Sequence, residues 1–358
     1  MNWGELITLE YGKPVKDKES TDGKVPVYGT NGQIGTSHLP AQCKHPSFIL
    51  GRKGAYRGVH YSDCPFSVID TAFYAEPLTD RIDLKWAYYK FLTYDINGMD
   101  SGSAIPSTDR YQIYSIEVEV PPLEKQRKIV AVLDCIDRKI NINQKINDNL
   151  QQQAAALFSS LYDRSNTEVR FTDLIQILGG GTPKTGENTY WNGNIAFFTP
   201  KDVGTPYTLI TEKTISKEGL SHCNSRLYPV NTVFVTARGT VGKVGMSGVP
   251  MAMNQSCYAL VGKETHQLLV YFYTLKAVDR LKHKASGAVF DAITTRDFES
   301  EQIMKLSDDD ATAFLRVAEP MFQEVLNNNI ENLRLSTLRD SLLPKLMSGE
   351  IDVSAVQL

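Results

Sequence analysis

The chain has 358 residues, of which 42% are hydrophobic and 22% charged, as is typical of soluble globular proteins with two or three domains. The net charge of −3 excludes a uniformly basic coat for nucleic acid, so any DNA affinity must come from local patches. No apolar run approaches the length of a membrane span, the first residues do not form a signal peptide, and the five cysteines include no CxxC pair. We therefore expect a cytoplasmic protein with reduced thiols and no membrane partner.

Residues 1–120 alternate short strand-like runs with turn signals such as Asn31-Gly32. Phe48–Leu50 and Ser67–Ile69 have the composition of strands, and Leu84–Tyr94 has the spacing of an amphipathic helix. This mixture predicts a globular α/β domain.

Residues 121–165 contain a stretch of about forty residues, ending at Leu161, with no glycine and with proline only at its start. Its apolar residues recur at alternating spacings of four and three if Asn143 and Asn147 are counted in the same seam. The pattern predicts one long helix, roughly 60 Å in length, that packs against another helix. Asn143 and Asn147 weaken such packing but fix its register, because a mispaired Asn is buried without a hydrogen bond.

Residues 166–306 repeat the first segment with a period of about 186 residues. An apolar run that ends in a Gly/Arg turn occurs in both copies, as Phe48–Gly54 and as Val233–Gly239. The other matched pairs are Asp70–Tyr74 with Asn254–Tyr258, Trp86–Leu92 with Leu269–Leu275, and Ser101–Ile113 with Ser286–Phe298. The repeat predicts two domains of one topology.

Residues 307–348 form a second stretch rich in Leu and Asn, in which Pro320 either kinks the helix or starts a fresh one. Residues 349–358 are a short tail. Two long helices of matched length, separated by a globular unit, pair most simply antiparallel. The predicted fold is therefore α+β, with two pseudo-repeated α/β domains separated by two long helices in an antiparallel coiled coil.

Polar and basic loops stand on both predicted domains, and we interpret them as DNA contacts. Arg can fork onto guanine, Lys favours phosphates, and Asn suits adenine or the backbone. The alternative is that each loop is only a solvated turn, but the presence of such loops in both copies favours a role in binding DNA. The candidate residues are Asn31, Arg52, Lys53, Tyr56 and Arg57 in the first copy and Thr199, Lys201, Arg238 and Lys243 in the second.

A catalytic centre is not evident. Arg238–Lys243 has some likeness to a phosphate-binding loop, but Ala237 replaces its first glycine and Val244 its Ser/Thr. Asp70, Asp83 and Lys85 follow the order of a nuclease site, although surface charges at a helix start explain them more simply.

Five residues of the first copy that could ligate a metal lie close together in the sequence. They lack the compact Cys and His pairs of zinc modules, and the second copy has no corresponding cluster. These residues are His38, Cys43, His45, His60 and Cys64. We expect no metal site.

Several motifs together carry a family resemblance. They are Pro121–Gln126 at the start of the first long helix, Tyr190–Gly193, Thr199–Asp202, and Leu338–Ile351 near the C-terminus. Over essentially its whole length the chain resembles the specificity (HsdS) subunits of type I restriction–modification systems.

The resemblance implies that 1–120 and 166–306 are target recognition domains, each reading one half of a bipartite double-stranded DNA target. The long helices would be a spacer that docks modification (methyltransferase) subunits, two of them, and through these the motor–nuclease restriction subunits. S-adenosylmethionine, ATP and Mg²⁺ would be bound by the partners and none by this chain, which would not itself be an enzyme. Since the two domains differ in nearly every loop residue, we expect an asymmetric target.

One departure from the family pattern concerns the second long helix. Leu306–Asp310 precedes it where a second Pro-Leu-x-x-Gln motif was possible, which leaves open whether the two docking sites are equivalent. The residues by themselves also allow a non-catalytic coiled-coil scaffold with duplicated protein-binding domains.

Overall fold

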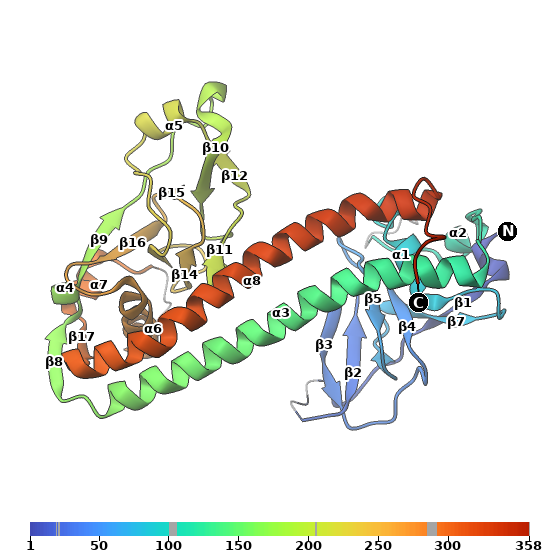
Figure 1. Ribbon diagram of the computed structural model, residues 1–358, viewed down its shortest axis with the longest axis horizontal. Helices are drawn as coiled ribbons and strands as arrows, with labels where there is room; N and C mark the ends of the chain where they lie inside the picture. The colour runs from blue at the N-terminus through green and yellow to red at the C-terminus, as the bar shows by residue number, and fades with distance from the viewer. Residues whose placement is uncertain (19, 21, 100–105, 205, 285–291, 358) are drawn as a thin grey trace. The chain divides into compact units, whose positions relative to one another are not determined.

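The computed structural model describes residues 1–18, 20, 22–99, 106–204, 206–284 and 292–357. The chain forms two compact units, residues 1–139 with 335–358 and residues 140–334. Each unit holds one globular domain and the adjoining parts of two long helices, α3 (Leu123–Asp163) and α8 (Asp308–Ser348) (Figure 1). Among the described residues, no helix combines the length and apolar character that crossing a membrane requires.

The described residues of the first domain form two sheets. The larger is antiparallel, with the order β1-β7-β4-β5 and bounds Ile7–Tyr11, Ala72–Pro77, Ser47–Gly51 and Val59–Ser62. The smaller has the order β3-β2-β6, in which β2 is antiparallel to β3 and parallel to β6, with bounds Gly32–Ser37, Val25–Gly29 and Ser67–Val68. Every residue of β4 is buried, as its short apolar run predicts for a strand in the middle of a sheet.

The helical elements in the described part of this domain are η1 (Trp3–Glu5), α1 (Leu84–Phe91) and α2 (Arg110–Ser115). The Asp83 carboxylate caps α1 by accepting hydrogen bonds from the backbone N–H groups of Lys85 and Trp86, at 2.8 and 3.0 Å. α1 packs its buried aromatic face onto the larger sheet, with the rings of Phe91 and of Phe48 on β4 4.9 Å apart. The predicted helix is thus confirmed, although it ends before Tyr94.

The second domain repeats this topology. Its larger sheet has the order β11-β14-β13-β16-β9, with bounds Tyr207–Thr208, Val244–Ser247, Val233–Thr236, Cys257–Gly262 and Ile175–Gly179. In its smaller sheet, β10 (Trp191–Phe198) is antiparallel to β12 (Lys213–Ile215) and parallel to β15 (Met251–Met253). β8 (Thr167–Arg170) and β17 (Gln302–Lys305) form a separate antiparallel pair. The remaining elements are α4 (Phe171–Leu174), η2 (Asn188–Tyr190), α5 (Lys217–Ser221), α6 (Gln267–Lys284) and α7 (Thr295–Ser300).

Matching backbone hydrogen bonds show how closely the copies correspond. Arg52 N and Lys53 N donate to Thr71 O at 2.9 and 3.1 Å, and Ala237 N and Arg238 N donate to Ser256 O at 2.8 and 3.3 Å. Each residue of the second set carries the number of its counterpart plus 185, close to the predicted period. The repeat is confirmed where residues are described; Ser101–Ser103 and Ser286–Ala288 of the predicted match lie outside them.

The two long helices are also as expected. α3 lies within the predicted segment 121–165 and α8 within 307–348, and the assignment of domain limits to these segments stays a prediction. α8 begins with a Ser307 cap, whose hydroxyl accepts a hydrogen bond from Asp310 N at 3.1 Å. Pro320 does not start a fresh helix, because α8 continues through it.

Within each unit, α3 and α8 contact one another. In the second unit, Asn143 bonds to Asn332 and Arg164 pairs with Asp310, so rising numbers on α3 meet falling numbers on α8. The helices are therefore antiparallel, which confirms the predicted fold class. The second domain packs onto them through an aromatic core that includes Phe158 of α3, with its ring 4.9 Å from that of Phe272.

In the first unit, α3 and α8 are joined to α1. Asp137 of α3 accepts hydrogen bonds from Arg339 Nη1 at 2.8 Å and from the Tyr89 hydroxyl at 2.7 Å. Beyond α8, Gly349 adopts a φ of +78°, which suits the end of a helix. The tail then returns to this unit, where Val353 is buried in its core.

Candidate nucleic-acid interface

A hairpin turn and a strand end meet on the first domain. Thr30 and Asn31 form the turn between β2 and β3. The Thr30 hydroxyl lies 2.8 Å from the carbonyl oxygen of Lys53 and 2.7 Å from that of Thr71, which ties the turn to the loop after β4. Asn31 is exposed beside these contacts. The fold thus brings together two predicted residues, Asn31 and Lys53.

Arg52 belongs to a stack of cationic and aromatic side chains. Its guanidinium carbon lies 4.9 Å from the ring centre of Tyr11, and that of Arg110 lies at the same distance from the same ring. Arg110 also lies over Tyr111, which is 65% exposed. The backbone N–H of Thr108 donates to Arg52 O at 2.8 Å, which positions α2 here. Stacking orients a guanidinium and leaves its N–H edge for phosphate or guanine.

The neighbouring Tyr56 and Arg57 have opposite environments. Tyr56 is 63% exposed, as a contact residue requires. Arg57 is 2% exposed, and its guanidinium donates to the carbonyl oxygens of Asn97 at 2.7 Å and Gly54 at 3.2 Å. The expectation of a DNA contact needs correction for Arg57, because its charge is used to hold the loop from inside.

Replacing Arg57 with alanine is expected to lower the free energy of unfolding by about 2 kcal/mol or more, because buried carbonyl groups lose a charged donor. The matched control is Lys53→Ala in the same loop, for which a change below about 0.5 kcal/mol is expected. Urea unfolding followed by circular dichroism measures both. Equal stability of the Arg57→Ala variant and the unaltered chain would contradict the structural role.

The second domain presents a hairpin loop at the same place, between β13 and β14. Thr236 N donates to Lys243 O at 3.0 Å, and Gly239 adopts a φ of +81° in the turn. Arg238 and Lys243 are exposed on either side of this turn. Within the described part of the chain, no carboxylate oxygen lies within 4.0 Å of their side-chain nitrogens. Both cations are therefore available to an anionic ligand.

Lys201 lies on the neighbouring loop. The Thr240 hydroxyl donates to Pro200 O at 3.3 Å, which joins this loop to the hairpin. The Lys201 side chain is 79% exposed and lies 3.5 Å from a Glu212 oxygen. Such an exposed pair is weak and is easily exchanged for a phosphate.

Thr199 shapes this loop from within. Its backbone N–H and its hydroxyl both donate to Asp202 Oδ2, at 2.8 and 2.6 Å. The hydroxyl is thus already engaged, so Thr199 supports the turn that carries Lys201.

The predicted residues of the two domains occupy equivalent places. β2 and β10 pair in the same parallel register with β6 and β15, and Asn31 and Lys201 each stand three residues after the last paired residue. Lys53 and Arg238 are equivalent by the hydrogen bonds given above. The two domains therefore present different side chains at equivalent positions of the same backbone fold.

Among the described residues, the stack of Arg52 and Arg110 on Tyr11 has no counterpart at the equivalent place of the second domain. Ala237 stands in the place of Arg52, and Gly179 in the place of Tyr11 at the end of β9. Sequence analysis missed Tyr11 and Arg110, because their contact with Arg52 depends on the pairing of distant segments and leaves no local pattern.

Asn143 and Asn147 are buried between α3 and α8, where they form a polar ladder. The Nδ2 groups of Asn143 and Asn147 donate to α8, and Asn147 Oδ1 accepts a hydrogen bond in return. The bonds run from Asn143 to Glu331 at 2.7 Å and Asn332 at 2.9 Å, from Asn147 to Asn329 at 2.9 Å, and from Asn328 to Asn147 at 2.9 Å. This geometry fits the register role, which stays a prediction.

Replacing Asn147 with leucine is expected to lower the free energy of unfolding by about 1–3 kcal/mol, because Asn328 is then buried without its partner. Adding Asn328→Leu is expected to recover most of that loss, since two apolar side chains can pack there. Urea unfolding of both single variants and the double variant measures the coupling. Additive losses would contradict the direct pairing of the two residues.

The starts of the two long helices differ in side-chain chemistry. Gln126 is fully buried near the start of α3, accepts from Asp83 N, and donates to Arg81 O and Pro121 O, each at 2.8 Å. Ala311 holds the equivalent place in α8, where a cavity of about 810 Å³ opens between α8 and the segment before α6. The glutamine of the Pro-Leu-x-x-Gln motif thus forms hydrogen bonds at the start of α3, whereas an alanine stands at the equivalent place of α8.

The nuclease-like trio does not form a site. The Asp83 carboxylate caps α1, and Lys85 Nζ lies 2.7 Å from Asp63 and 2.6 Å from Asp134. Asp70 is exposed outside these contacts. Likewise, Arg238–Lys243 lies in a hairpin between two strands, whereas a phosphate-binding loop leads from a strand into a helix.

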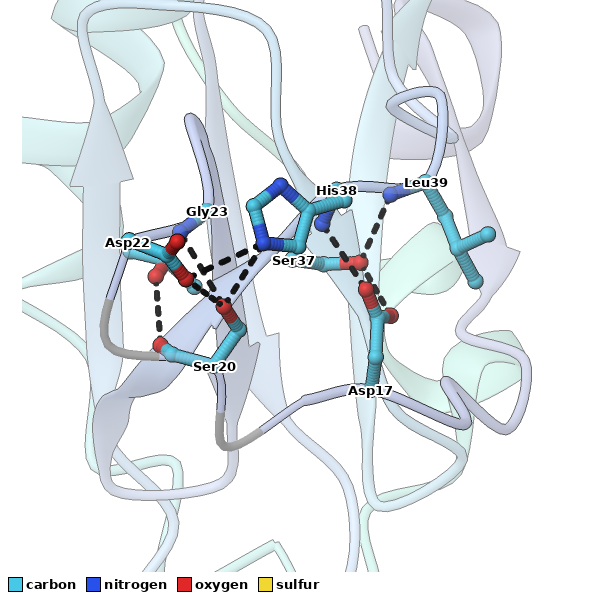
Figure 2. A network of polar contacts seen from close by, with 8 residues as sticks. Asp17, Ser20, Asp22, Gly23, Ser37, His38 and Leu39 are labelled. Carbon is cyan, nitrogen blue, oxygen red and sulfur yellow. Dashed lines mark hydrogen bonds and ion pairs between the residues drawn. The ribbon is translucent and has the colours of Figure 1, made fainter.

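Figure 2 shows a Ser, a His and an Asp together at the surface of the first domain. Ser20 Oγ and Asp22 Oδ1 both lie 3.1 Å from His38 Nε2, whereas a hydrolytic triad uses opposite ring nitrogens. Hydrogen bonds from the Ser37 hydroxyl and the His38 backbone lower the pKa of the Asp17 carboxyl. The network attaches the connection between β1 and β2 to the end of β3.

Residues 2–152 and 164–305 match the family model for the type I restriction modification DNA specificity domain. The chain belongs to this family. The two matched regions contain the two globular domains, so the family match repeats where the fold repeats. The resemblance stated from the sequence motifs is confirmed.

Curated relatives carry corresponding names. The type I restriction enzyme HindI specificity subunit of Haemophilus influenzae is 23% identical, over 74% of this chain and 74% of that protein. The EcoR124I/EcoR124II specificity subunit of Escherichia coli is 24% identical, over 66% of this chain and 67% of that protein. Among solved structures, the type I restriction–modification S subunit of M. genitalium superposes with a TM-score of 0.64 at 16% identity, covering 97% of this chain and 95% of that one, which shows a shared fold.

Proposed function

We propose that this chain is the DNA-recognition subunit of a type I restriction–modification complex, in which each globular domain binds one half of a bipartite double-stranded target. The observation that carries the proposal is the match of a DNA specificity family to two domains of one topology in a single chain. The exposed cations and aromatic rings at equivalent strand ends support it, because they suit phosphates and base edges.

The target is asymmetric. Asn31 and Lys53 of one domain are replaced by Lys201 and Arg238 at the equivalent places of the other. Amide and cationic groups prefer different base edges, so the same backbone design reads two different half-sites. Arg52 with its stacked rings adds a contact that only the first domain can make.

The antiparallel helices set the gap between the half-sites. Each has 41 residues, which corresponds to roughly 60 Å of α-helix. Half-sites about one DNA turn apart, roughly 34 Å, suit a spacer of that length. The buried ladder around Asn143 and Asn147 supports this role, since a slip in register would leave polar groups unpaired.

Catalysis belongs to partner subunits in this proposal. Two modification subunits dock on the helices, and restriction subunits join through them, in the cytoplasm. S-adenosylmethionine, ATP and Mg²⁺ are then bound by those partners. The structural use of Asp83, Lys85 and His38 supports a non-catalytic chain.

The test is selection of bound sequences from random DNA, by the chain alone and with its methyltransferase subunits. Enrichment of two short sequences separated by a fixed gap is expected. Binding of a protein partner with no DNA sequence enriched would favour the alternative, a scaffold with duplicated protein-binding domains. Divalent-metal-dependent cutting of DNA by the isolated chain would favour a nuclease.

A further inference from the structure

Cys43, His45 and Glu76 of the first domain bring three kinds of metal ligand together. Their ligand atoms all lie within 4.8 Å of one another. Cys43 Sγ lies 3.9 Å from His45 Nε2 and 3.9 Å from Glu76 Oε1, while His45 Nε2 lies 2.7 Å from Glu76 Oε2. Thiolate, imidazole and carboxylate are the three groups by which proteins bind Zn²⁺.

The His45 ring is already oriented for a metal. Its Nδ1 lies 3.0 Å from the carbonyl oxygen of Pro46, to which it can donate a hydrogen bond. Nε2 faces Cys43 and Glu76 and donates to Glu76 Oε2 at 2.7 Å, so it becomes a metal ligand once the ion displaces that proton. Histidines that ligate metals are commonly held in this way through their second ring nitrogen.

Cys43 and Glu76 stand on rigid backbone. Cys43 exchanges two backbone hydrogen bonds with Phe66, at 3.0 and 3.1 Å, and its side chain is fully buried in a small apolar cluster. Glu76 lies on β7 of the larger sheet. Burial raises the pKa of the Cys43 thiol to about 11, so a metal must displace a proton that is firmly held.

We propose that Cys43, His45 and Glu76 bind one Zn²⁺ ion, with water as the fourth ligand. Tetrahedral zinc sets ligand separations of about 3.5 Å between sulfur and nitrogen and about 3.3 Å between nitrogen and oxygen. The sulfur–nitrogen separation of 3.9 Å is about 0.4 Å longer and the nitrogen–oxygen separation of 2.7 Å about 0.6 Å shorter than these, differences that side-chain rotation supplies. The His45 and Glu76 side chains are 37% and 34% exposed, so water reaches the fourth position.

The ion would act as a structural staple. It joins the segment before β4, where Cys43 and His45 lie, to β7, where Glu76 lies. Cys43 is also bonded to Phe66, immediately before β6 of the smaller sheet. The staple would therefore hold the two sheets of the first domain together.

The second domain also joins its two sheets at the residue equivalent to Cys43. Tyr228 exchanges backbone hydrogen bonds with Met251, as Cys43 does with Phe66 at the numbers lower by 185. The Tyr228 hydroxyl then donates to Gly179 O at 3.0 Å, which reaches the edge strand β9. A tyrosine hydrogen bond thus joins the two sheets of the second domain at β9, whereas zinc at Glu76 would join those of the first domain at β7.

This proposal revises the expectation of no metal site. Of the metal-ligand cluster in the sequence, His38 bonds to Ser20 and Asp22, His60 lies 3.3 Å from Thr30 O, and Cys64 is exposed. The third ligand is Glu76, which follows His45 by 31 residues and reaches it only through sheet formation.

The test is a titration of the full chain, freed of metal by a chelator, with Co²⁺ alone. One Co²⁺ per chain and a thiolate-to-cobalt charge-transfer band are expected, and Zn²⁺ is expected to abolish the band and to raise the melting temperature. Cys43→Ser is expected to remove the band. Glu76→Gln, which keeps the side-chain shape and so preserves folding, is expected to weaken Co²⁺ binding at least about tenfold.

Cys64→Ser and Cys257→Ser are the matched controls. Cys64 is an exposed thiol of the same domain and Cys257 a buried thiol of the other, and both variants are expected to bind Co²⁺ as the unaltered chain does. Circular dichroism confirms that each variant is folded. Absence of the band from the unaltered chain, its persistence in Cys43→Ser, or unchanged affinity in Glu76→Gln would overturn the proposal.

Discussion

Inserting four residues into α3 after Lys139 and four into α8 after Arg334 is expected to lengthen the gap between the DNA half-sites. Four residues add about one helical turn, or about 6 Å, and B-DNA rises about 3.4 Å per base pair. The gap should therefore grow by one to two base pairs, while both half-sites stay unchanged. The insertions fall where the two compact units divide, so the contacts within each domain are kept. Mapping the methylated sequences of the complex assembled with its modification subunits measures the result.

Insertion into α3 alone is the control. It puts the α3–α8 contacts of one unit, such as Asn143 with Asn332, out of register with those of the other, such as Asp137 with Arg339, so one set must break and leave buried polar groups unpaired. That variant is expected to be destabilised and inactive, whereas the paired insertion keeps the ladder intact. Altered half-sites with an unchanged gap in the paired variant would contradict the spacer role of the helices.

The parts of the fold that produce a repeating pattern in the sequence could be predicted from it. The long helix before Leu161 follows from a seam without glycine, and the duplicated fold follows from matched stretches such as Phe48–Gly54 and Val233–Gly239. The behaviour of Pro320 was not accessible. A proline removes one helical hydrogen bond, and whether neighbouring turns keep the helix continuous depends on packing around it.

The candidate interface was accessible only in part. Lys53 and Arg238 were found because a basic turn follows a buried strand in both copies. Arg57 was misjudged, since residue type alone does not show which cation of a loop turns inward to bind carbonyl groups. Tyr11 and Arg110 were missed because they meet through tertiary structure. Local patterns thus predict which loops matter, and long-range pairing decides which side chains are presented.

Replacing Lys53 or Arg238 with alanine is expected to weaken recognition of one half-site each, and of a different one in the two variants. The residues occupy equivalent places after strands of separate domains, where Arg238 is exposed and Lys53 half-buried. Loss of a base-directed cation costs about 1–3 kcal/mol, or about five- to 150-fold in affinity, and relaxes the sequence requirement at that position. Binding to DNAs altered in one half-site at a time, with the methyltransferase subunits present, measures the effect.

Lys24→Ala is the matched control, because it removes the same charge from the first domain at the opposite end of β2 from Asn31. It is expected to leave the affinity for both half-sites within about twofold, since a distant surface charge is screened by salt. A uniform loss over all sequences in Lys53→Ala or Arg238→Ala, with a weaker salt dependence, would instead indicate phosphate contacts. Loss at the same half-site in both variants would contradict the assignment of one half-site to each domain. The two substitutions therefore distinguish recognition of bases from nonspecific attraction to DNA. The two residues hold equivalent positions on a repeated fold, so the half-site that each variant fails to recognise shows which domain binds it.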